Sequence, residues 1–188
     1  GLKALLRGAT RRLAGKNTDS SYHLKQAMGG GKTHAITALS YLARHKELRE
    51  QILPDVPEAT SFSAVRFAAF NGRERPVDYF WGRIVCQLGA PELLNGDVSD
   101  PPDEAGWIRI FSKNPTPVLI VLDELPPYFE YLNTVTMGSG TMADRAANAF
   151  ATMLSAAHRL KNICVVVSDL AGTYGAGSSI INRALQNA

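Results

Sequence analysis

An α/β fold, with a mainly parallel central sheet flanked by helices, is the architecture that this sequence predicts. Short apolar runs alternate along the chain with longer segments of helical periodicity, and this alternation is typical of strand–helix–strand units. Two of the runs, "VLIVL" and "ICVVV", are apolar at every position, as expected of strands that helices cover on both faces. A glycine-rich stretch, "GGGKT", separates an expected strand from an expected helix.

The size and composition of the chain predict one soluble domain over 1–188. The 188 residues suffice for one sizeable core and are too few for two ordinary domains. Hydrophobic residues make up 45% and charged residues 20%, a balance typical of globular proteins. No apolar run approaches the ~20 residues of a membrane helix, so we expect no membrane partner. Cys86 and Cys164 lie in apolar-patterned segments, and we expect both to be buried free thiols in a cytoplasmic protein.

The first 16 residues carry a local excess of positive charge. Five of the chain's 20 basic residues precede the first acidic residue. The rest of the chain contains 15 basic and 17 acidic residues, and the net charge of the whole chain is +3. Lys3, Arg7 and Arg11 recur every four residues and form one stripe of an expected helix over 1–16, opposite an apolar face. The stripe is either the solvated face of a packing helix or a contact to nucleic acid or an acidic partner.

The first half of the chain predicts two more strands and two more helices. A strand near 21–27 enters the glycine-rich stretch, and a helix over 32–45 follows it. "LPDVPEAT" contains two prolines and is expected to be a loop, and "SAVRFAAF" at 63–70 is the next strand. Asp78 is positioned to cap a helix that runs to about Leu88.

The second half predicts two fully buried strands, "PVLIVLDE" and "NICVVVSD". A short helix is expected near 107–111, and a long Ala-rich helix over 142–160 follows the expected loop "NTVTMGSGT". The Gly/Ser-rich loop "AGTYGAGSS" leads to a closing helix over 180–186. Residues 20–188 therefore form one core, which follows the basic helix over 1–16.

The glycine-rich stretch carries the chemistry of a phosphate-binding loop. Amide groups of Gly29, Gly30 and Gly31 can wrap around phosphate oxygens, because glycine has no side chain to block a close approach. Lys32 would bring a positive charge to the terminal phosphates, and the Thr33 hydroxyl would bind Mg²⁺ at the start of the helix.

Two positions around this loop leave alternatives open. Gln26 stands where the pattern G-x-x-x-x-G-K-[ST] has its first glycine, so a chance glycine-rich turn is an alternative to a phosphate loop. His34, in the first turn of the expected helix, either touches the nucleotide, packs against the protein or faces solvent. A second site further along the chain therefore decides the interpretation.

That second site is the pair of acids that ends the strand "VLIVL". Asp123 is positioned to anchor a phosphate-bound Mg²⁺ through water, because such an ion needs an anionic group from a neighbouring strand. Glu124 could polarise the attacking water as a general base. The alternative is that both acids cap the next helix, whose first turn suits Pro126 and Pro127.

"GGGKTH" and "VLIVLDE" together resemble the Walker A and Walker B motifs of P-loop NTPases. The Asp-Glu ending and the intervening "SAVRFAAFN" resemble the additional-strand branch that contains AAA+ ATPases. With "DYFWGRIVCQLG" and "VLIVLDELPPYFEYL", most of the chain is similar to an uncharacterised family of large predicted AAA+-type ATPases. That family is encoded beside DNA methylases and helicases in prokaryotic anti-phage loci, and its glycine-rich loop often lacks the opening glycine. The resemblance implies a three-layer P-loop NTPase fold in a fragment of a larger protein.

The resemblance also implies roles for residues that follow other strands. Asn71 stands where AAA+ proteins often keep a polar residue that restrains the catalytic glutamate, although "NGRERP" equally favours a simple turn. Ser168 and Asp169 end the "ICVVV" strand, where such proteins place a sensor of the γ-phosphate. Arginine fingers could come from three residues among which the sequence does not choose, Arg145, Arg159 and Arg183.

These features predict an ATP-binding protein, a Mg²⁺-dependent ATPase that couples hydrolysis to conformational work. Its expected partners are ATP and ADP, DNA or proteins of a defence complex, and further copies of itself. The alternative is a nucleotide-gated switch or scaffold with negligible turnover. A small-molecule kinase uses the same loop but is less favoured, because Asp123-Glu124 favours activation of water and no acceptor site is recognisable.

Overall fold

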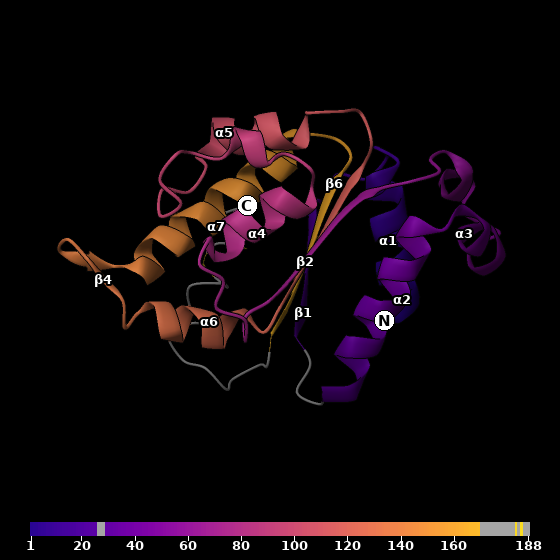
Figure 1. Ribbon diagram of the computed structural model, residues 1–188. Coiled ribbons are helices and arrows are strands. Elements are labelled where there is room, and N and C mark those ends of the chain that lie inside the picture. The colour runs from indigo at the N-terminus through magenta and orange to yellow at the C-terminus, as the bar shows by residue number, and fades with distance from the viewer. Residues whose placement is uncertain (26–28, 170–182, 184, 186–188) are drawn as a thin grey trace.

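A four-stranded parallel sheet lies between two layers of helices in the computed structural model, which describes residues 1–25, 29–169, 183 and 185 (Figure 1). The strands are β1 (Ser21–Lys25), β2 (Arg66–Asn71), β3 (Val118–Asp123) and β6 (Ile163–Asp169). Their order across the sheet is β1-β6-β3-β2, so β6 separates β1 from β3. The predicted α/β class, a parallel central sheet flanked by helices, is confirmed.

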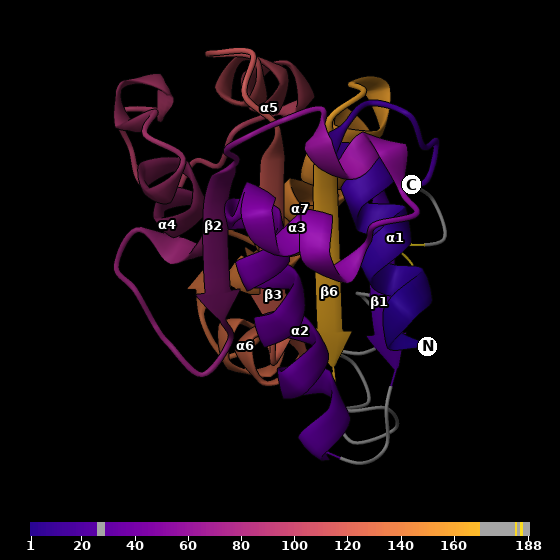
Figure 2. The same ribbon diagram turned by 90° about the vertical axis from the view of Figure 1, so that its right-hand side faces the viewer.

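Each face of the sheet has its own layer of helices. One layer contains α1 (Leu2–Leu13), α2 (Gly29–Arg44) and α3 (Lys46–Ile52), which lie in front of the strands in Figure 2. The other contains α4 (Tyr79–Gln87), α5 (Glu104–Phe111), α6 (Leu125–Leu132) and α7 (Met142–Arg159). None of the helices that the structure describes is both long enough and apolar enough to cross a membrane.

The central strands β3 and β6 are apolar up to their polar carboxyl ends because both of their faces are covered. In β3, Ile120 and Leu122 pack into the cluster formed with α4 to α7, whereas Leu119 and Val121 pack into the cluster formed with α1 and α2. Successive strand residues point to opposite faces, so alternate positions serve the two clusters. This arrangement explains the uninterrupted run "VLIVL" in the sequence.

Two helices begin earlier than predicted. Helix α2 starts at Gly29 rather than at 32, so the three glycines form its first turn instead of a separate loop. Helix α5 starts at Glu104 because Asp103 caps it, its side chain accepting a hydrogen bond of 2.7 Å from the Gly106 amide. Asp78 does precede α4, but its side chain makes no capping hydrogen bond.

Other local structure was missed or placed differently. Helix α3 was not predicted because "KELREQI" has no apolar stripe, and its buried residue is Arg49. The expected loop "NTVTMGSGT" contains a small antiparallel hairpin of β4 (Thr136–Met137) and β5 (Gly140–Thr141), with Gly138 at a positive φ in its turn. Short 3-10 helices occur at Pro57–Thr60, within another expected loop, and at Pro91–Leu93.

Parts of the sequence interpretation fall outside the described residues. These parts are the end of the first strand with Gln26, the loop "AGTYGAGSS", and nearly all of the closing helix expected over 180–186. In β2, the strand begins at Arg66 and extends to Asn71, so its end lies one residue beyond the predicted range.

The basic stripe on α1 makes contacts within the chain. Arg7 forms an ion pair with Asp55, and Arg11 Nε lies 3.5 Å from Glu58 Oε1. The hydrogen bond from Arg7 lowers the pKa of the Asp55 carboxyl. Two of the three residues in the stripe therefore help to hold the segment after α3, which favours the interpretation as one face of a packing helix.

Two buried arginines and the half-buried Arg66 hold helix ends through backbone carbonyls. Arg12 donates to the carbonyl oxygens of Ala157 and Leu160 at the end of α7. Arg49 and Arg66 make similar bonds, at the end of α2 for Arg49 and at the ends of α4 and α5 for Arg66. A cation is favourable at a helix C-terminus, where carbonyls lack intrahelical donors. Burial lowers the pKa of each guanidinium.

The two thiols differ in exposure. Cys164 in β6 is buried, as predicted, and burial raises its pKa to about 12. Cys86 is exposed, so its predicted burial was wrong. Its neighbours Ile84 and Val85 supply the buried face of α4, and residue 86 lies on the other side of that helix.

Candidate functional site

Polar residues from three strands meet at the carboxyl edge of the sheet. Register pairs Asn71 of β2 with Asp123 of β3, and Asp123 with Ser168 of β6. Ser168 in turn pairs with Leu24 of β1, one residue before that strand ends. The structure therefore brings three predicted site residues side by side on neighbouring strands. Asp169 pairs with Lys25, and its side chain is not among those that the structure describes.

Glu124 follows this row in an unusual backbone conformation. Its φ of 57° and ψ of 37° lie in the left-handed region, which a non-glycine residue adopts at a cost of about 1–3 kcal/mol. The Glu124 amide donates to the Ser168 carbonyl oxygen over 3.2 Å and to Asp123 Oδ1 over 3.0 Å. These contacts tie the turn after β3 to the end of β6.

The backbone after β2 presses against the same turn. The Gly72 amide donates to the Asp123 carbonyl oxygen over 2.8 Å. A Cβ atom at residue 72 would lie 1.8 Å from the Glu124 carbonyl oxygen, so only glycine fits at this crossing. Glu124 is thus held from both neighbouring strands.

Two buried polar atoms at this edge lack hydrogen bonds within the described part of the chain. They are Glu124 Oε2 and Ser168 Oγ, and the side chain of Ser168 is fully buried. Leaving a buried polar atom unsatisfied costs about 1–3 kcal/mol, so such atoms call for an explanation. Both atoms belong to residues that the sequence singles out for catalysis or sensing.

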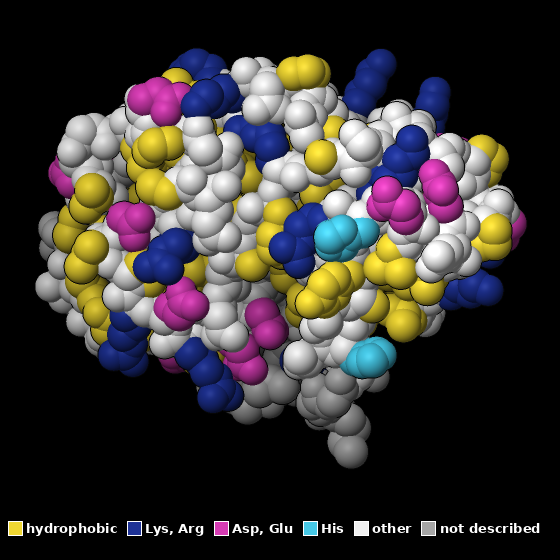
Figure 3. Space-filling model, turned by 45° about the vertical axis from the view of Figure 1, so that its right-hand side comes forward, with side chains coloured by type: hydrophobic (Ala, Val, Ile, Leu, Met, Phe, Trp, Pro, Cys, Tyr) yellow, Lys and Arg dark blue, Asp and Glu magenta, His cyan; other side chains and the backbone are white. Residues whose placement is uncertain are grey.

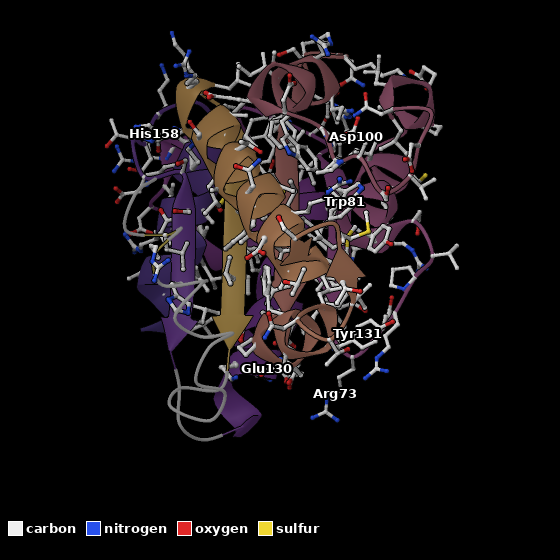
Figure 4. The ribbon with its side chains drawn as sticks, turned by 90° about the vertical axis from the view of Figure 1, so that its left-hand side faces the viewer. Arg73, Trp81, Asp100, Glu130, Tyr131 and His158 are labelled. Atoms are coloured by element: carbon white, nitrogen blue, oxygen red, sulfur yellow. The ribbon has the colours of Figure 1, made fainter. Side chains whose placement is uncertain are left out.

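Arg73 is a site residue that sequence reasoning missed. Its Nε lies 3.8 Å from Glu124 Oε2, and its side chain extends from the lower end of the molecule in Figure 4. Asn71 Oδ1 accepts a hydrogen bond of 2.9 Å from the Arg73 amide, which shapes the turn that carries this arginine. Asn71 therefore acts on the turn, as its alternative interpretation held, and Arg73 is the residue that contacts Glu124. A charged residue two positions beyond a strand end was the available signal.

The glycine-rich segment begins helix α2 at the same edge of the sheet. Strand β1 ends at Lys25 and α2 starts at Gly29, so the start of α2 lies beside the carboxyl ends of the strands (Figure 2). The first four amides of a helix have no intrahelical acceptor, and together with the helix dipole they attract anions. Lys32 is buried, with 4% exposure, whereas Thr33 and His34 are exposed.

The donor set at this edge suits a magnesium–phosphate group. Thr33 and Asp123 supply a hydroxyl and a carboxylate, the hard oxygen ligands that Mg²⁺ prefers. Within the described ranges, no three residues among His, Cys, Asp and Glu cluster as a self-contained metal site. Mg²⁺ at nucleotide sites usually takes one or two carboxylates and fills its shell with phosphate oxygens and water. The residues present therefore fit a metal held jointly with a nucleotide.

The candidate arginine fingers do not converge on this edge. Arg145 Nη1 donates to the Ser99 carbonyl oxygen over 2.8 Å, and Arg159 Nε lies 2.7 Å from Glu104 Oε1. Arg183 is exposed. The first two are thus engaged elsewhere on the surface.

Comparison with known proteins returned no match: no family model, no curated protein and no solved structure is similar to this chain. The case for a function therefore rests on the geometry of the carboxyl edge.

Proposed function

We propose that the chain is an ATP-binding domain of the P-loop NTPase type and hydrolyses ATP with Mg²⁺. The observation that carries the proposal is the row of Asn71, Asp123 and Ser168, followed by Glu124, at the edge where the glycine-rich helix begins. Ligands of parallel α/β sheets bind at the carboxyl ends of strands, so this placement supports a binding site there.

The strand order gives separate support. The resemblance to the additional-strand branch implies a strand between the one that enters the phosphate loop and the one that ends in the acidic pair. Here β6 lies between β1, which leads to "GGGKT", and β3, which ends at Asp123. The order therefore agrees with the resemblance stated for the motifs, although the sequence pattern did not reveal it.

Each residue has a role in the proposed reaction. Free amides at the start of α2 and the Lys32 ammonium bind and orient the phosphates, and Thr33 and Asp123 hold the metal. Mg²⁺, when bound, neutralises phosphate charge. Glu124 accepts the proton of the attacking water, and Oε2, which accepts no hydrogen bond from the described residues, is the atom that receives it. Ser168 Oγ is the unpaired donor through which β6 contacts the terminal phosphate or the water.

A nucleotide-gated switch with slow turnover is the second candidate. The ion pair between Arg73 and Glu124 favours it, because a carboxylate engaged by a cation is a poorer proton acceptor. Under either candidate, we propose that nucleotide binding is coupled to DNA, to a protein partner or to a second copy of the chain. This part of the proposal is based on the family resemblance.

Turnover and nucleotide binding by two charge-matched variants test the proposal. Glu124→Gln should keep ATP affinity within about twofold and lose turnover by 10²-fold or more, as expected on removal of a general base. Glu50→Gln, an exposed change of the same kind on α3, should leave both unchanged. Measurements run with and without duplex DNA and at several protein concentrations. If the parent protein did not bind ATP, the proposal would be contradicted. If Glu124→Gln turned over ATP at the rate of the parent, Glu124 would not be the general base.

A further inference from the structure

Two adjoining hollows lie at the amino edge of the sheet, opposite the candidate site. One, of about 390 Å³, lies between the segment after α1 and the end of α7, and the other, of about 400 Å³, lies between the ends of α5 and α7. Leu160 and Lys161 line both, so the hollows adjoin, and the two together are called the basic groove. Figure 4 places His158, another lining residue, at the upper end of the molecule and Arg73 at the lower end.

The groove is strongly basic. Its lining residues include five cations, Arg12, Lys16, Lys113, Arg159 and Lys161, and no aspartate or glutamate. Figure 3 shows Lys and Arg side chains along this upper edge of the molecule. Acids that lie outside the lining pair with two of the cations: Glu104 with Arg159 at 2.7 Å and Glu92 with Lys113 at 2.6 Å.

The remaining cations have no carboxylate partner within the described residues. Lys16 and Lys161 are exposed and form no ion pair there. Arg12 is 3% exposed, and its guanidinium donates only to carbonyl oxygens, those of Ile163, Asn17, Ala157 and Leu160. Carbonyl oxygens already stabilise the Arg12 guanidinium, so the cations left to attract an anion into the groove are Lys16 and Lys161.

The distribution of cations over both hollows indicates a polymer rather than a single small anion. Lys16 lines the first hollow, Lys161 belongs to both, and Lys113 lies in the second. Cations spread over two adjoining hollows suit the successive phosphates of a nucleic-acid strand. Among the lining residues Phe111 is buried, which leaves the His158 imidazole as the exposed ring, so most contacts available in the groove are to the backbone.

We propose that this basic groove binds the phosphodiester backbone of a nucleic acid, at the edge of the sheet opposite the nucleotide site. The two sites occupy opposite ends of the same strands, so both ligands can be bound together. The inference does not depend on ATP hydrolysis, because the groove shares no residue with the carboxyl edge.

Fluorescence anisotropy of a labelled duplex oligonucleotide and of its single strand, measured without ATP, tests this groove. The double variant Lys16→Gln/Lys161→Gln should weaken binding about tenfold and reduce the slope of log affinity against log salt by about 2, one for each lost phosphate contact. Lys3→Gln/Lys46→Gln removes the same charge elsewhere on α1 and α3 and should leave both quantities unchanged. Thermal unfolding should be unaltered in both variants, since Lys16 and Lys161 are exposed.

Three results would overturn the inference. The first is a groove variant that binds both oligonucleotides with the affinity of the parent. The second is an equal loss of affinity in the control variant, which would assign binding to overall charge or to the stripe on α1. The third is an equal loss of affinity for a labelled poly-glutamate, which would assign the groove to an acidic polypeptide.

Discussion

The Nε atom of Arg73 lies 3.8 Å from Oε2 of Glu124, and so links the segment after β2 to the proposed general base. The arginine side chain is 70% exposed, so water screens this pair and its strength is at most about 1 kcal/mol. An interaction of that size can favour one position of the Glu124 carboxylate without immobilising it. We infer that Arg73 restrains Glu124 until a partner or nucleotide draws the arginine away.

Removing that restraint should raise turnover. Arg73→Gln is expected to increase the ATPase rate by up to about fivefold, the factor that 1 kcal/mol supplies, with ATP affinity unchanged. Arg83→Gln is the matched control, because Arg83 forms a similar exposed pair with Glu74 at 3.5 Å. Steady-state turnover measures both. A fall in rate for Arg73→Gln would mean that the arginine orients Glu124 for catalysis instead of restraining it.

Replacing Gly72 should unfold the protein more easily. In Gly72→Ala the new Cβ would overlap the Glu124 carbonyl oxygen, so the two segments must separate. We expect the free energy of unfolding in urea to fall by about 1–3 kcal/mol or more, the range for forced overpacking. Gly96→Ala is the control, because nothing lies within 4 Å of a Cβ atom there. Equal stability of the two variants would contradict the close backbone crossing.

Ser168→Ala should separate stability from activity. Its hydroxyl is buried and makes no hydrogen bond to the described residues, so its loss should change the free energy of unfolding by less than about 1 kcal/mol. Turnover should fall by about 10- to 150-fold if the hydroxyl contacts the phosphate or water, since one charge-assisted hydrogen bond is worth about 1.5–3 kcal/mol. Urea denaturation and ATPase assays on the same preparation measure the two effects. A large loss of stability would instead show a structural partner for this hydroxyl.

The two thiols should react at very different rates. At pH 8 a thiol-specific reagent is expected to label Cys86 and spare Cys164, because Cys86 is exposed while burial raises the pKa of Cys164 to about 12. The thiolate is the reactive form, so a raised pKa leaves almost none of it at that pH. Mass spectrometry should find one label on the folded protein and two in denaturant. Two labels under native conditions would contradict the buried position of β6.

The core strands could be predicted because their sequences leave little choice. Runs such as "VLIVL" are apolar on both faces, and the acids that follow mark where the strand leaves the core. The order of the strands could not be predicted in this way, because it depends on contacts between segments far apart in the chain. The register that sets Asn71, Asp123 and Ser168 in one row is a property of that order.

Residues of the candidate site can be selected from the sequence by their type, whereas their contacts cannot. Asp123, Glu124 and Ser168 stand out because polar residues end buried strands, whereas Arg73 lies in a turn where charged residues are ordinary. Helix α3 shows the same limit for local structure. The buried residue of α3 is Arg49, which donates hydrogen bonds to carbonyl oxygens of other segments. A helix of this kind has no apolar periodicity by which the sequence could reveal it.

The contact between Gly72 and Glu124 makes the turn after β3 mechanically dependent on the segment after β2. Main-chain atoms touch there, so a displacement of residue 72 must move residue 124 as well, with no side chain between them to absorb it. A ligand that displaced the β2–α4 connection would therefore also displace the proposed catalytic carboxylate. Residues remote from the proposed nucleotide site would in this way set the rate of the proposed hydrolysis.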